Sequence, residues 1–216
     1  MYTSIIKKVL MALSGIFLMV FLLQHLLINL TSLLPDDGKT FNIISHFMGY
    51  NPLVQFVLQP ILILGVFFHF TMGIILEYQN KKARNSKYVY HKTRSSWISK
   101  NMIITGLVIL AFLALHFYDF WIPEMEYKYI NNMLPENERY FHELQKKFHS
   151  NLTKTITYCV SFILLGLHLR HGLASSFQSV GITSSRQRTL TIIANIYSLF
   201  ISIGFTIIAL FHYSTG

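Results

Sequence analysis

Residues 9–34 read VLMALSGIFLMVFLLQHLLINLTSLL, a run of 26 residues without Asp, Glu, Lys or Arg. A helix needs about 20 mostly apolar residues to cross the hydrocarbon core of a bilayer. Lys7 and Lys8 precede the run, as basic residues precede the core of a secretory signal. The run is too long for such a signal, and no small-residue cleavage site closes it. We therefore expect a membrane helix that the mature protein keeps.

Five such runs dominate the chain. The other four lie at about 53–78, 101–121, 155–177 and 190–213, and the five together take up more than half of the 216 residues. Composition agrees, because 52% of the residues are hydrophobic and 12% are charged, whereas a soluble domain carries about 25% charged residues. The sequence predicts a single all-α membrane domain over residues 1–216, a bundle of five transmembrane helices.

The charged residues outside the apolar runs are unevenly distributed. Twelve of the 18 basic residues lie before the first run, between the second and third, or at and after the end of the fourth, accompanied by a single acidic residue, Glu77. The remaining segments hold six basic and eight acidic residues. Under the positive-inside rule this distribution predicts an N-terminus in the cytoplasm and a C-terminus outside.

The net charge of +9 has further interpretations. Nucleic-acid binding would need a basic face on a soluble module, and the sequence contains no such module. The basic segment from Lys81 to Lys100 suits anionic lipid head groups, the interpretation that we favour, or an acidic protein partner. We therefore expect contact with membrane lipids and no nucleic-acid partner.

Four of the ten histidines lie deep within the predicted membrane helices: His25, His69, His116 and His168. An ionisable side chain is costly in a bilayer, so its presence there suggests a function. Counting from the flanking charges at about 1.5 Å per residue puts His25 and His116 towards the outer face. The same count puts His69 and His168 nearer the inner face. The four histidines therefore form an outer pair and an inner pair, each from two helices.

Paired imidazoles on facing helices are typical axial ligands of haem iron. We expect two b-type haems, one between His25 and His116 and one between His69 and His168, which together form an electron path across the membrane. One membrane histidine alone would suit an interhelical hydrogen bond equally well, but four in separate helices favour ligation. The single cysteine, Cys159, allows no Cys-x-x-Cys-His attachment, so any haem is held noncovalently.

Other residues near the inner pair have two interpretations each. Gly65, Gly73 and Gly172 lie one turn from an inner histidine, where they either clear space for a porphyrin edge or allow close helix packing. Arg170 suits a haem propionate or a position at the membrane interface. His171 competes with His168 as the ligand, because it lies three residues further along the same helix.

Short motifs keep a regular order along nearly the whole chain. They are Ser14-Gly15, Leu23-Gln24-His25-Leu26 with Asn29, Ser45-His46-Phe47-Met48, Pro52, His69-x-x-x-Gly73, Leu115-His116-Phe117, His168-Leu169-Arg170-His171-Gly172-Leu173 with Phe177, Gly181-Ile182-Thr183 and Arg186-Gln187-Arg188. In this order they resemble the cytochrome b membrane anchor of succinate dehydrogenases and fumarate reductases, of the single-chain, five-helix, di-haem type. His171 departs from the residue more usual at that place in the family.

The resemblance implies a non-catalytic subunit of an oxidoreductase in the cytoplasmic (inner) membrane, serving the tricarboxylic acid cycle or its reverse. An FAD-containing flavoprotein that interconverts succinate and fumarate and an iron–sulfur subunit would dock on its cytoplasmic face. The anchor would relay electrons through two b haems, with His25, His69, His116 and His168 as ligands, to or from a quinone that is typically menaquinone. Gln59, beside Pro60, is our candidate for binding the quinone, and an interhelical hydrogen bond is its alternative.

Three other functions remain open at this stage. One is the haem b subunit of another membrane oxidoreductase, of the hydrogenase or formate dehydrogenase type. A second is a histidine-relay transporter of protons or metal ions, which would need carboxylates within the membrane and internal repeats, and the sequence suggests neither. The third is an anchor without a cofactor, for which the four membrane histidines would have no purpose.

Overall fold

The computed structural model describes residues 2–84, 102–131, 133, 136, 138–182 and 187–215. Most of these residues are helical, and none of them lies in a strand. Five helices are long and apolar enough to cross a membrane: Ile5–Leu33, Val54–Lys82, Met102–Ile130, Leu152–Ser179 and Gln187–Thr215. The predicted all-α chain with five such helices is confirmed. Part of the predicted basic segments, namely Lys87, Lys92, Arg94, Lys100 and Arg186, lies outside the described residues.

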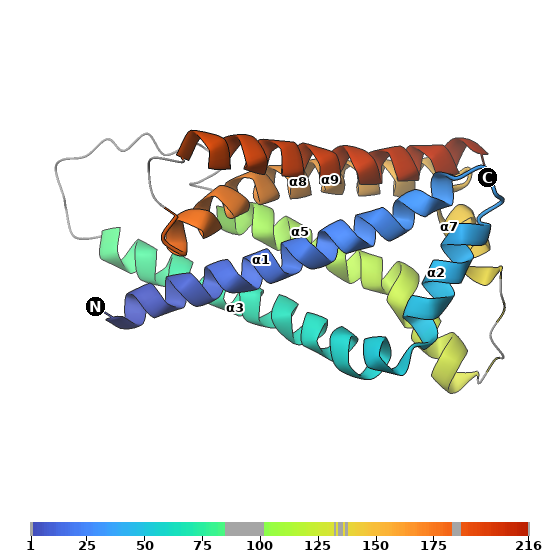
Figure 1. Ribbon diagram of the computed structural model, residues 1–216, viewed down its shortest axis with the longest axis horizontal. Helices are drawn as coiled ribbons and strands as arrows, with labels where there is room; N and C mark the ends of the chain where they lie inside the picture. The colour runs from blue at the N-terminus through green and yellow to red at the C-terminus, as the bar shows by residue number, and fades with distance from the viewer. Residues whose placement is uncertain are drawn as a thin grey trace.

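The first half of the chain contains two long helices joined by a shorter one (Figure 1). Its elements are α1 (Tyr2–Leu30), η1 (Thr31–Leu33), α2 (Lys39–Tyr50), a single π-helical turn η2 (Val54–Leu58) and α3 (Gln59–Arg84). Helix α2 lies where the sequence predicts a loop. Gly38 precedes the first residue of α2 and has a φ of 75°, which suits a glycine. A side chain at Gly38 would also collide with the ring of Phe141.

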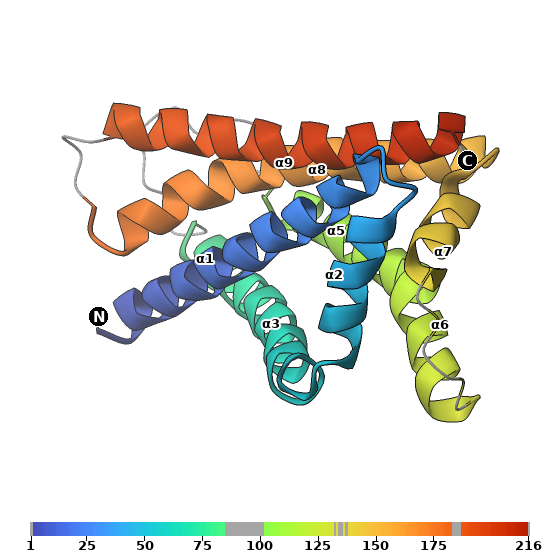
Figure 2. The same cartoon turned by 45° about the vertical axis from the view of Figure 1, so that its right-hand side comes forward.

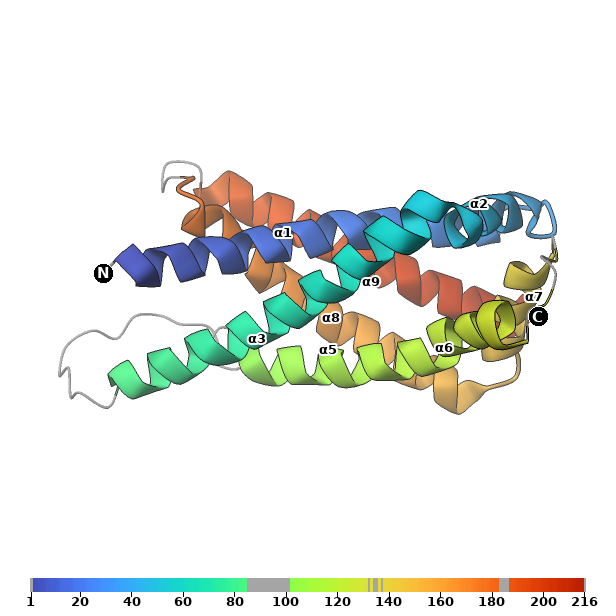
Figure 3. The same ribbon diagram turned by 90° about the horizontal axis from the view of Figure 1, so that it is seen from below.

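The second half contributes three long helices. Its elements are α5 (Met102–His116), η3 (Phe117–Trp121), α6 (Ile122–Met125), η4 (Glu126–Ile130), α7 (Arg139–Phe148), α8 (Leu152–Ser179) and α9 (Gln187–Thr215), of which η3 and η4 are π-helical turns. Helices α8 and α9 lie side by side along most of their length. Helix α3 crosses the bundle diagonally and contacts α1 and α5 (Figure 3).

Small residues allow the long helices to approach one another closely. A Cβ on Gly166 of α8 would lie 2.9 Å from Cβ of Ser202 in α9, and the Ser202 hydroxyl donates a hydrogen bond of 2.8 Å to the Phe162 carbonyl. A Cβ on Gly204 of α9 would lie 2.9 Å from the side chain of Leu26 in α1, which is fully buried. Close backbone approach of this kind is typical of membrane helices, where van der Waals packing replaces the hydrophobic effect.

The third membrane helix is longer than predicted. The sequence predicts its end at residue 121, but helical structure continues through η3, α6 and η4 to Ile130. The extension contains Glu124 and Lys128, whose charges suggest a loop when the sequence is considered alone. In the structure their side chains pair with one another. Pairing lowers the cost of carrying both charges into a helix.

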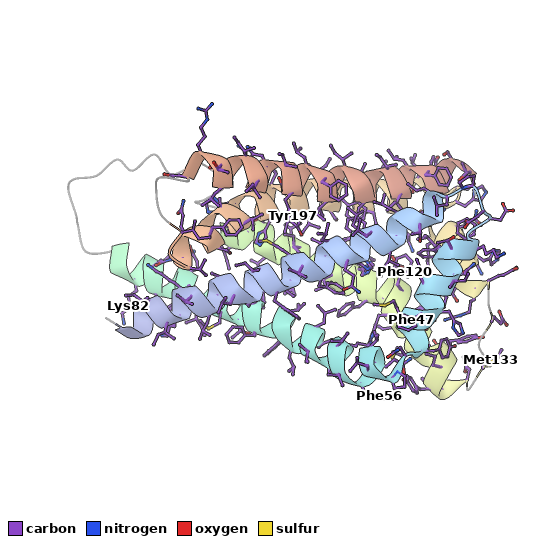
Figure 4. All side chains as sticks on the ribbon, in the orientation of Figure 1. Phe47, Phe56, Lys82, Phe120, Met133 and Tyr197 are labelled. Carbon is purple, nitrogen blue, oxygen red and sulfur yellow. The ribbon has the colours of Figure 1, made fainter. Side chains whose placement is uncertain are left out.

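One end of the bundle carries the exposed basic residues Lys8, Lys81, Lys82 and Arg188, which lie near the ends of α1, α3 and α9. Figure 4 shows Lys82 at the end that holds the N-terminus and Met133 at the opposite end, near the C-terminus. Helices α2 and α7 lie across this second end (Figure 2). They are joined by a hydrogen bond of 2.9 Å from the backbone N–H of Phe141 to Oδ1 of Asn42. We call the first end the basic end and the second the capped end.

Candidate functional site

The rings of His25 in α1 and His116 at the last position of α5 lie together near the capped end. Their centroids are 5.9 Å apart, and their planes are nearly perpendicular at 83°. An imidazole nitrogen lies about 2 Å from the metal that it binds, so two imidazoles on opposite sides of one metal ion have centroids about 6 Å apart. The observed separation therefore fits a shared metal. This cluster is the outer pair.

Aromatic side chains surround the outer pair. The ring of Phe21 stacks on His25 at 5.7 Å, and the ring of Phe205 lies 5.6 Å from it. Around His116 lie the rings of Phe112, Phe120 and Tyr158, at 6.0, 5.1 and 6.4 Å. The Nδ1 atom of His116 is buried without a hydrogen-bond partner among the described residues. The outer pair is therefore enclosed by aromatic rings, and His116 keeps one ring nitrogen without a hydrogen bond to the described residues.

A buried carboxylate follows His116 by three residues. The sequence places Asp119 at the outer end of the third run, and the structure shows it in the π-helical turn η3, only 3% exposed. Its oxygens accept hydrogen bonds from the Tyr158 hydroxyl at 2.8 Å and from the Lys154 ammonium group at 2.7 Å. A buried charge is tolerable when it is paired in this way. The sequence signal that could have revealed this carboxylate is the position of Asp119 one helical turn after His116.

His69 of α3 is held by a hydroxyl group from α1. Its Nδ1 atom lies 3.0 Å from Oγ of Ser14, and the Ser14 hydroxyl donates a hydrogen bond of 2.9 Å to the carbonyl of Met11. The hydroxyl of Ser14 therefore lies between a helix carbonyl and an imidazole.

His168 of α8 is held in the same way by α5. Its Nδ1 atom lies 3.1 Å from Oγ1 of Thr105, and the Thr105 hydroxyl donates to the carbonyl of Met102 at 2.9 Å. His168 is also near enough to His69 for the two rings to interact electrostatically. In both cases Nδ1 is engaged and Nε2 is the ring nitrogen left for a metal. We call His69 and His168 the inner pair.

A glycine lies beneath each ring of the inner pair. A Cβ on Gly15, the neighbour of Ser14, would lie 3.3 Å from Cε1 of His69, and a Cβ on Gly106, the neighbour of Thr105, would lie 3.7 Å from Cε1 of His168. The glycines named from sequence have other neighbours. A Cβ on Gly65 would meet the ring of Phe17, and those on Gly73 and Gly172 would meet methionine side chains. Sequence reasoning named Ser14-Gly15 only as part of a motif and missed Thr105-Gly106.

The helices that carry the outer pair also contact the inner pair, at a different level of the bundle. Ser14, which contacts the inner pair, precedes His25 by eleven residues in α1, and Thr105 precedes His116 by eleven in α5. Eleven residues make just over three helical turns, so both side chains of each helix lie on one face, about 16 Å apart along the axis. The sequence of each helix reads Ser/Thr-Gly, nine residues, then His.

The remaining candidates lie less close to the paired histidines. Arg170 is exposed, and two residues of helix turn its side chain about 200° away from that of His168. This position favours the membrane interface over a propionate. Gln59 is half-buried at the first position of α3. For the fourth membrane helix the contact of Nδ1 of His168 with the Thr105 hydroxyl favours His168 over His171 as the ligand.

A charged network closes the capped end. The carboxylate of Glu124 accepts from the Tyr140 hydroxyl at 2.8 Å and pairs with Arg139 and Lys128. Burial raises the pKa of Tyr140 to about 12. Lys128 also lies over the ring of Tyr50, 4.3 Å from its centroid. The network joins α2, α6, η4 and α7.

Two buried polar atoms near this network have no partner among the described residues. They are Nε2 of His46 and the hydroxyl oxygen of Tyr50, both in α2. The two rings stack with centroids 4.5 Å apart. The sequence predicts His46 in a loop, where a solvated side chain would be ordinary, so this pair was missed. Burial also raises the pKa of Tyr50.

Comparisons with known proteins gave no match to this chain. No family model matches it, and no match was found among curated proteins or among solved structures.

Proposed function

We propose that this chain is a di-haem cytochrome b that anchors a succinate:quinone oxidoreductase in the cytoplasmic membrane. It relays electrons between the iron–sulfur subunit of that complex and a quinone of the menaquinone class. The observation that carries the proposal is the 5.9 Å separation of the His25 and His116 rings, which come from two different membrane helices.

Paired imidazoles suit haem better than a bare metal ion. A zinc ion takes four ligands, and hard or transition metal ions take four to eight. Over residues 2–84, 102–131 and the described remainder, no three side chains of His, Cys, Asp or Glu gather as a metal-binding group. Two axial imidazoles suffice only where the metal brings its own equatorial ligands. Haem does so, and it supplies a carrier that takes up and releases one electron.

In this proposal, residues of the chain bind the haem iron and exclude water from the haem sites. His25 with His116, and His69 with His168, would hold the two haems, and each haem would supply a carrier of one electron. The aromatic rings around the outer pair keep water away from the site, and the glycines beneath the inner pair let flat groups approach the backbone. The hydroxyls that contact the inner pair lie about 16 Å along α1 and α5 from the outer pair, so the two levels would offer an electron path along the bundle.

The basic end supports a docking role on the cytoplasmic side. Exposed basic side chains there come from α1, α3 and α9, namely Lys8, Lys81, Lys82 and Arg188. A surface of this charge attracts an acidic partner or anionic lipid head groups. We assign it to the iron–sulfur subunit, which would carry the FAD-containing flavoprotein with it.

The quinone has two candidate sites near the capped end. Gln59 is the one suggested by sequence. The stacked pair of His46 and Tyr50 adds two buried polar atoms without partners. A quinone carbonyl accepts hydrogen bonds, so an imidazole N–H or a phenol hydroxyl can bind it. This match of donors to acceptors favours His46 and Tyr50.

Absorption spectroscopy tests the proposal on the complex captured from native membranes through a tag on this chain. We expect a b-type spectrum on reduction, about two haems per chain, and reduction of those haems when succinate is added. A colourless complex, or haem that succinate does not reduce in a sample containing flavin, would contradict the proposed function.

A further inference from the structure

Ser14 and Thr105 occupy equivalent positions in two helices that are far apart in the sequence. Each is followed directly by a glycine, and each precedes the outer histidine of its own helix by eleven residues. Each hydroxyl contacts Nδ1 of an inner histidine on a neighbouring helix, His69 for Ser14 and His168 for Thr105. Helices α1 and α5 therefore support the inner pair with the same local structure.

The protons in these contacts can be assigned by chemistry. A hydroxyl carries a single hydrogen, and its oxygen accepts through lone pairs. Ser14 donates its hydrogen to the Met11 carbonyl, and Thr105 donates its hydrogen to the Met102 carbonyl. Neither hydroxyl has a hydrogen left for an imidazole. The bonds to His69 and His168 therefore run from Nδ1–H to the hydroxyl oxygen, and Nε2 of each ring keeps its lone pair.

We propose that Ser14 and Thr105 are positioning residues of the inner haem site, which hold His69 and His168 in the Nδ1–H tautomer with Nε2 available to the iron. The proposal rests on the proposed function. Partners that orient a ligating histidine in this way are common at metal centres, where they fix the ring and raise its basicity. Gly15 and Gly106 complete the support, because the imidazole edges lie against their backbones.

The two hydroxyls should therefore affect the reduction potential of the inner haem. An imidazole whose Nδ1–H donates a hydrogen bond gives more electron density to the metal, which stabilises the oxidised iron relative to the reduced iron. Loss of the hydroxyl should therefore move the reduction potential of the inner haem to more positive values. The outer haem, whose ligand His116 has a buried Nδ1 without a partner among the described residues, should not change.

The test compares two kinds of substitution in the purified full-length protein. Ser14→Ala and Thr105→Val remove the hydroxyls, whereas Ser14→Thr and Thr105→Ser keep them. We expect a positive shift of one of the two haem potentials, with a changed low-spin ferric resonance of that haem, only in the first kind. Thr206→Val is the matched control, because the Thr206 hydroxyl donates only to the Ser202 carbonyl of its own helix. An unchanged potential and resonance in both Ser14→Ala and Thr105→Val would overturn the inference.

Nitrogen NMR of labelled histidines in the haem-free full-length chain separates this inference from the proposed function. We expect the Nδ1–H tautomer for both His69 and His168, which requires no bound haem. The Nε2–H tautomer at both positions would overturn the inference even where two haems bind. Absence of haem from the protein in its native membrane would instead overturn the proposed function, and the tautomers would still decide the role of the two hydroxyls.

Discussion

Ser14 and Thr105 support the inner histidines from opposite sides of the bundle with hydrogen bonds of nearly equal length, 3.0 and 3.1 Å. The helices that carry them also carry the two outer histidines, on the same faces and three turns further along. Helices α1 and α5 thus take part in both levels of the bundle, whereas His69 of α3 and His168 of α8 belong to the inner level. Because α1 and α5 each run through both levels, they hold the two pairs at a fixed separation.

Removal of one inner ligand should remove one haem. In the His69→Ala variant, the haem content of the purified chain should fall from about two to about one per chain, because the outer pair keeps both of its imidazoles. His142→Ala is the control, since His142 is exposed in α7, and it should keep both haems. Haem content is measured by pyridine haemochrome absorbance. Loss of both haems from a correctly folded His69→Ala protein would contradict the separate pairs.

The two outer histidines should act as one unit. His25→Ala and His116→Ala should each remove the same haem, so the double variant should lose no more haem than either single variant. Residues that share one function show this non-additive behaviour. The measurement is haem content together with the reduced spectrum of each variant. Additive losses, with one haem missing in each single variant and two in the double variant, would mean that the two rings bind different irons.

Tyr50 should contribute to quinone binding and little to stability. Its hydroxyl oxygen has no hydrogen-bond partner among the described residues, so Tyr50→Phe breaks no hydrogen bond with any of them. One lost hydrogen bond to the quinone is worth about 1 kcal/mol, so we expect a several-fold rise in the KM for quinone and an unchanged unfolding temperature. Tyr129→Phe is the control, because its hydroxyl donates to Gln55 at 2.9 Å on an exposed surface. An unchanged KM would place the quinone elsewhere, with Gln59 as the next candidate.

The ion pair of Asp119 and Lys154 should stabilise the capped end. Lys154→Met leaves the carboxylate of Asp119 buried, with the Tyr158 hydroxyl as its remaining hydrogen-bond partner among the described residues. Because Lys154 is partly exposed, we expect a loss of about 2 kcal/mol in the free energy of unfolding, below the usual cost of breaking a fully buried pair. Adding Asp119→Asn should recover part of that loss. Denaturant unfolding in detergent measures both, and a double variant less stable than Lys154→Met would contradict the pairing.

Acid should weaken the start of α2 through Asp36. The side chain and the backbone N–H of Thr40 both donate to Oδ2 of Asp36, at 2.6 and 2.9 Å, and these bonds lower the pKa of the Asp36 carboxyl. A carboxyl with a lowered pKa in the folded state stabilises the protein above its ordinary pKa, and this contribution is lost as the pH falls through the folded value. Unfolding temperatures between about pH 5 and pH 2 should therefore fall more steeply for the unmodified protein than for Asp36→Asn. Equal slopes would contradict this role.

Sequence patterns predicted the long elements well, because a membrane helix is specified by the length and polarity of one continuous segment. The runs ending near residues 34, 177 and 213 lie within a few residues of the observed helix ends. Depth counting also separated the histidines into two levels, since the rise per residue is constant along a helix.

Features that depend on contacts between distant segments could not be predicted in this way. Glu124 and Lys128 suggest a loop by their charge, and only pairing with each other and with Arg139 explains their place in a helix. Burial of Asp119 likewise depends on Lys154 from another helix. The π-helical turns have no sequence signal that we recognised, and the bonds from Ser14 and Thr105 follow from helix packing rather than from spacing alone.

A density map of the purified protein with its native cofactors tests the central claim most directly. The account predicts two flat macrocycles at two levels of the bundle, one with its iron between the rings of His25 and His116 and the other between those of His69 and His168. The two irons should lie about 16 Å apart along the helix axes. A map in which these rings contact no metal, or in which one metal is bound by histidines from both levels, would contradict it.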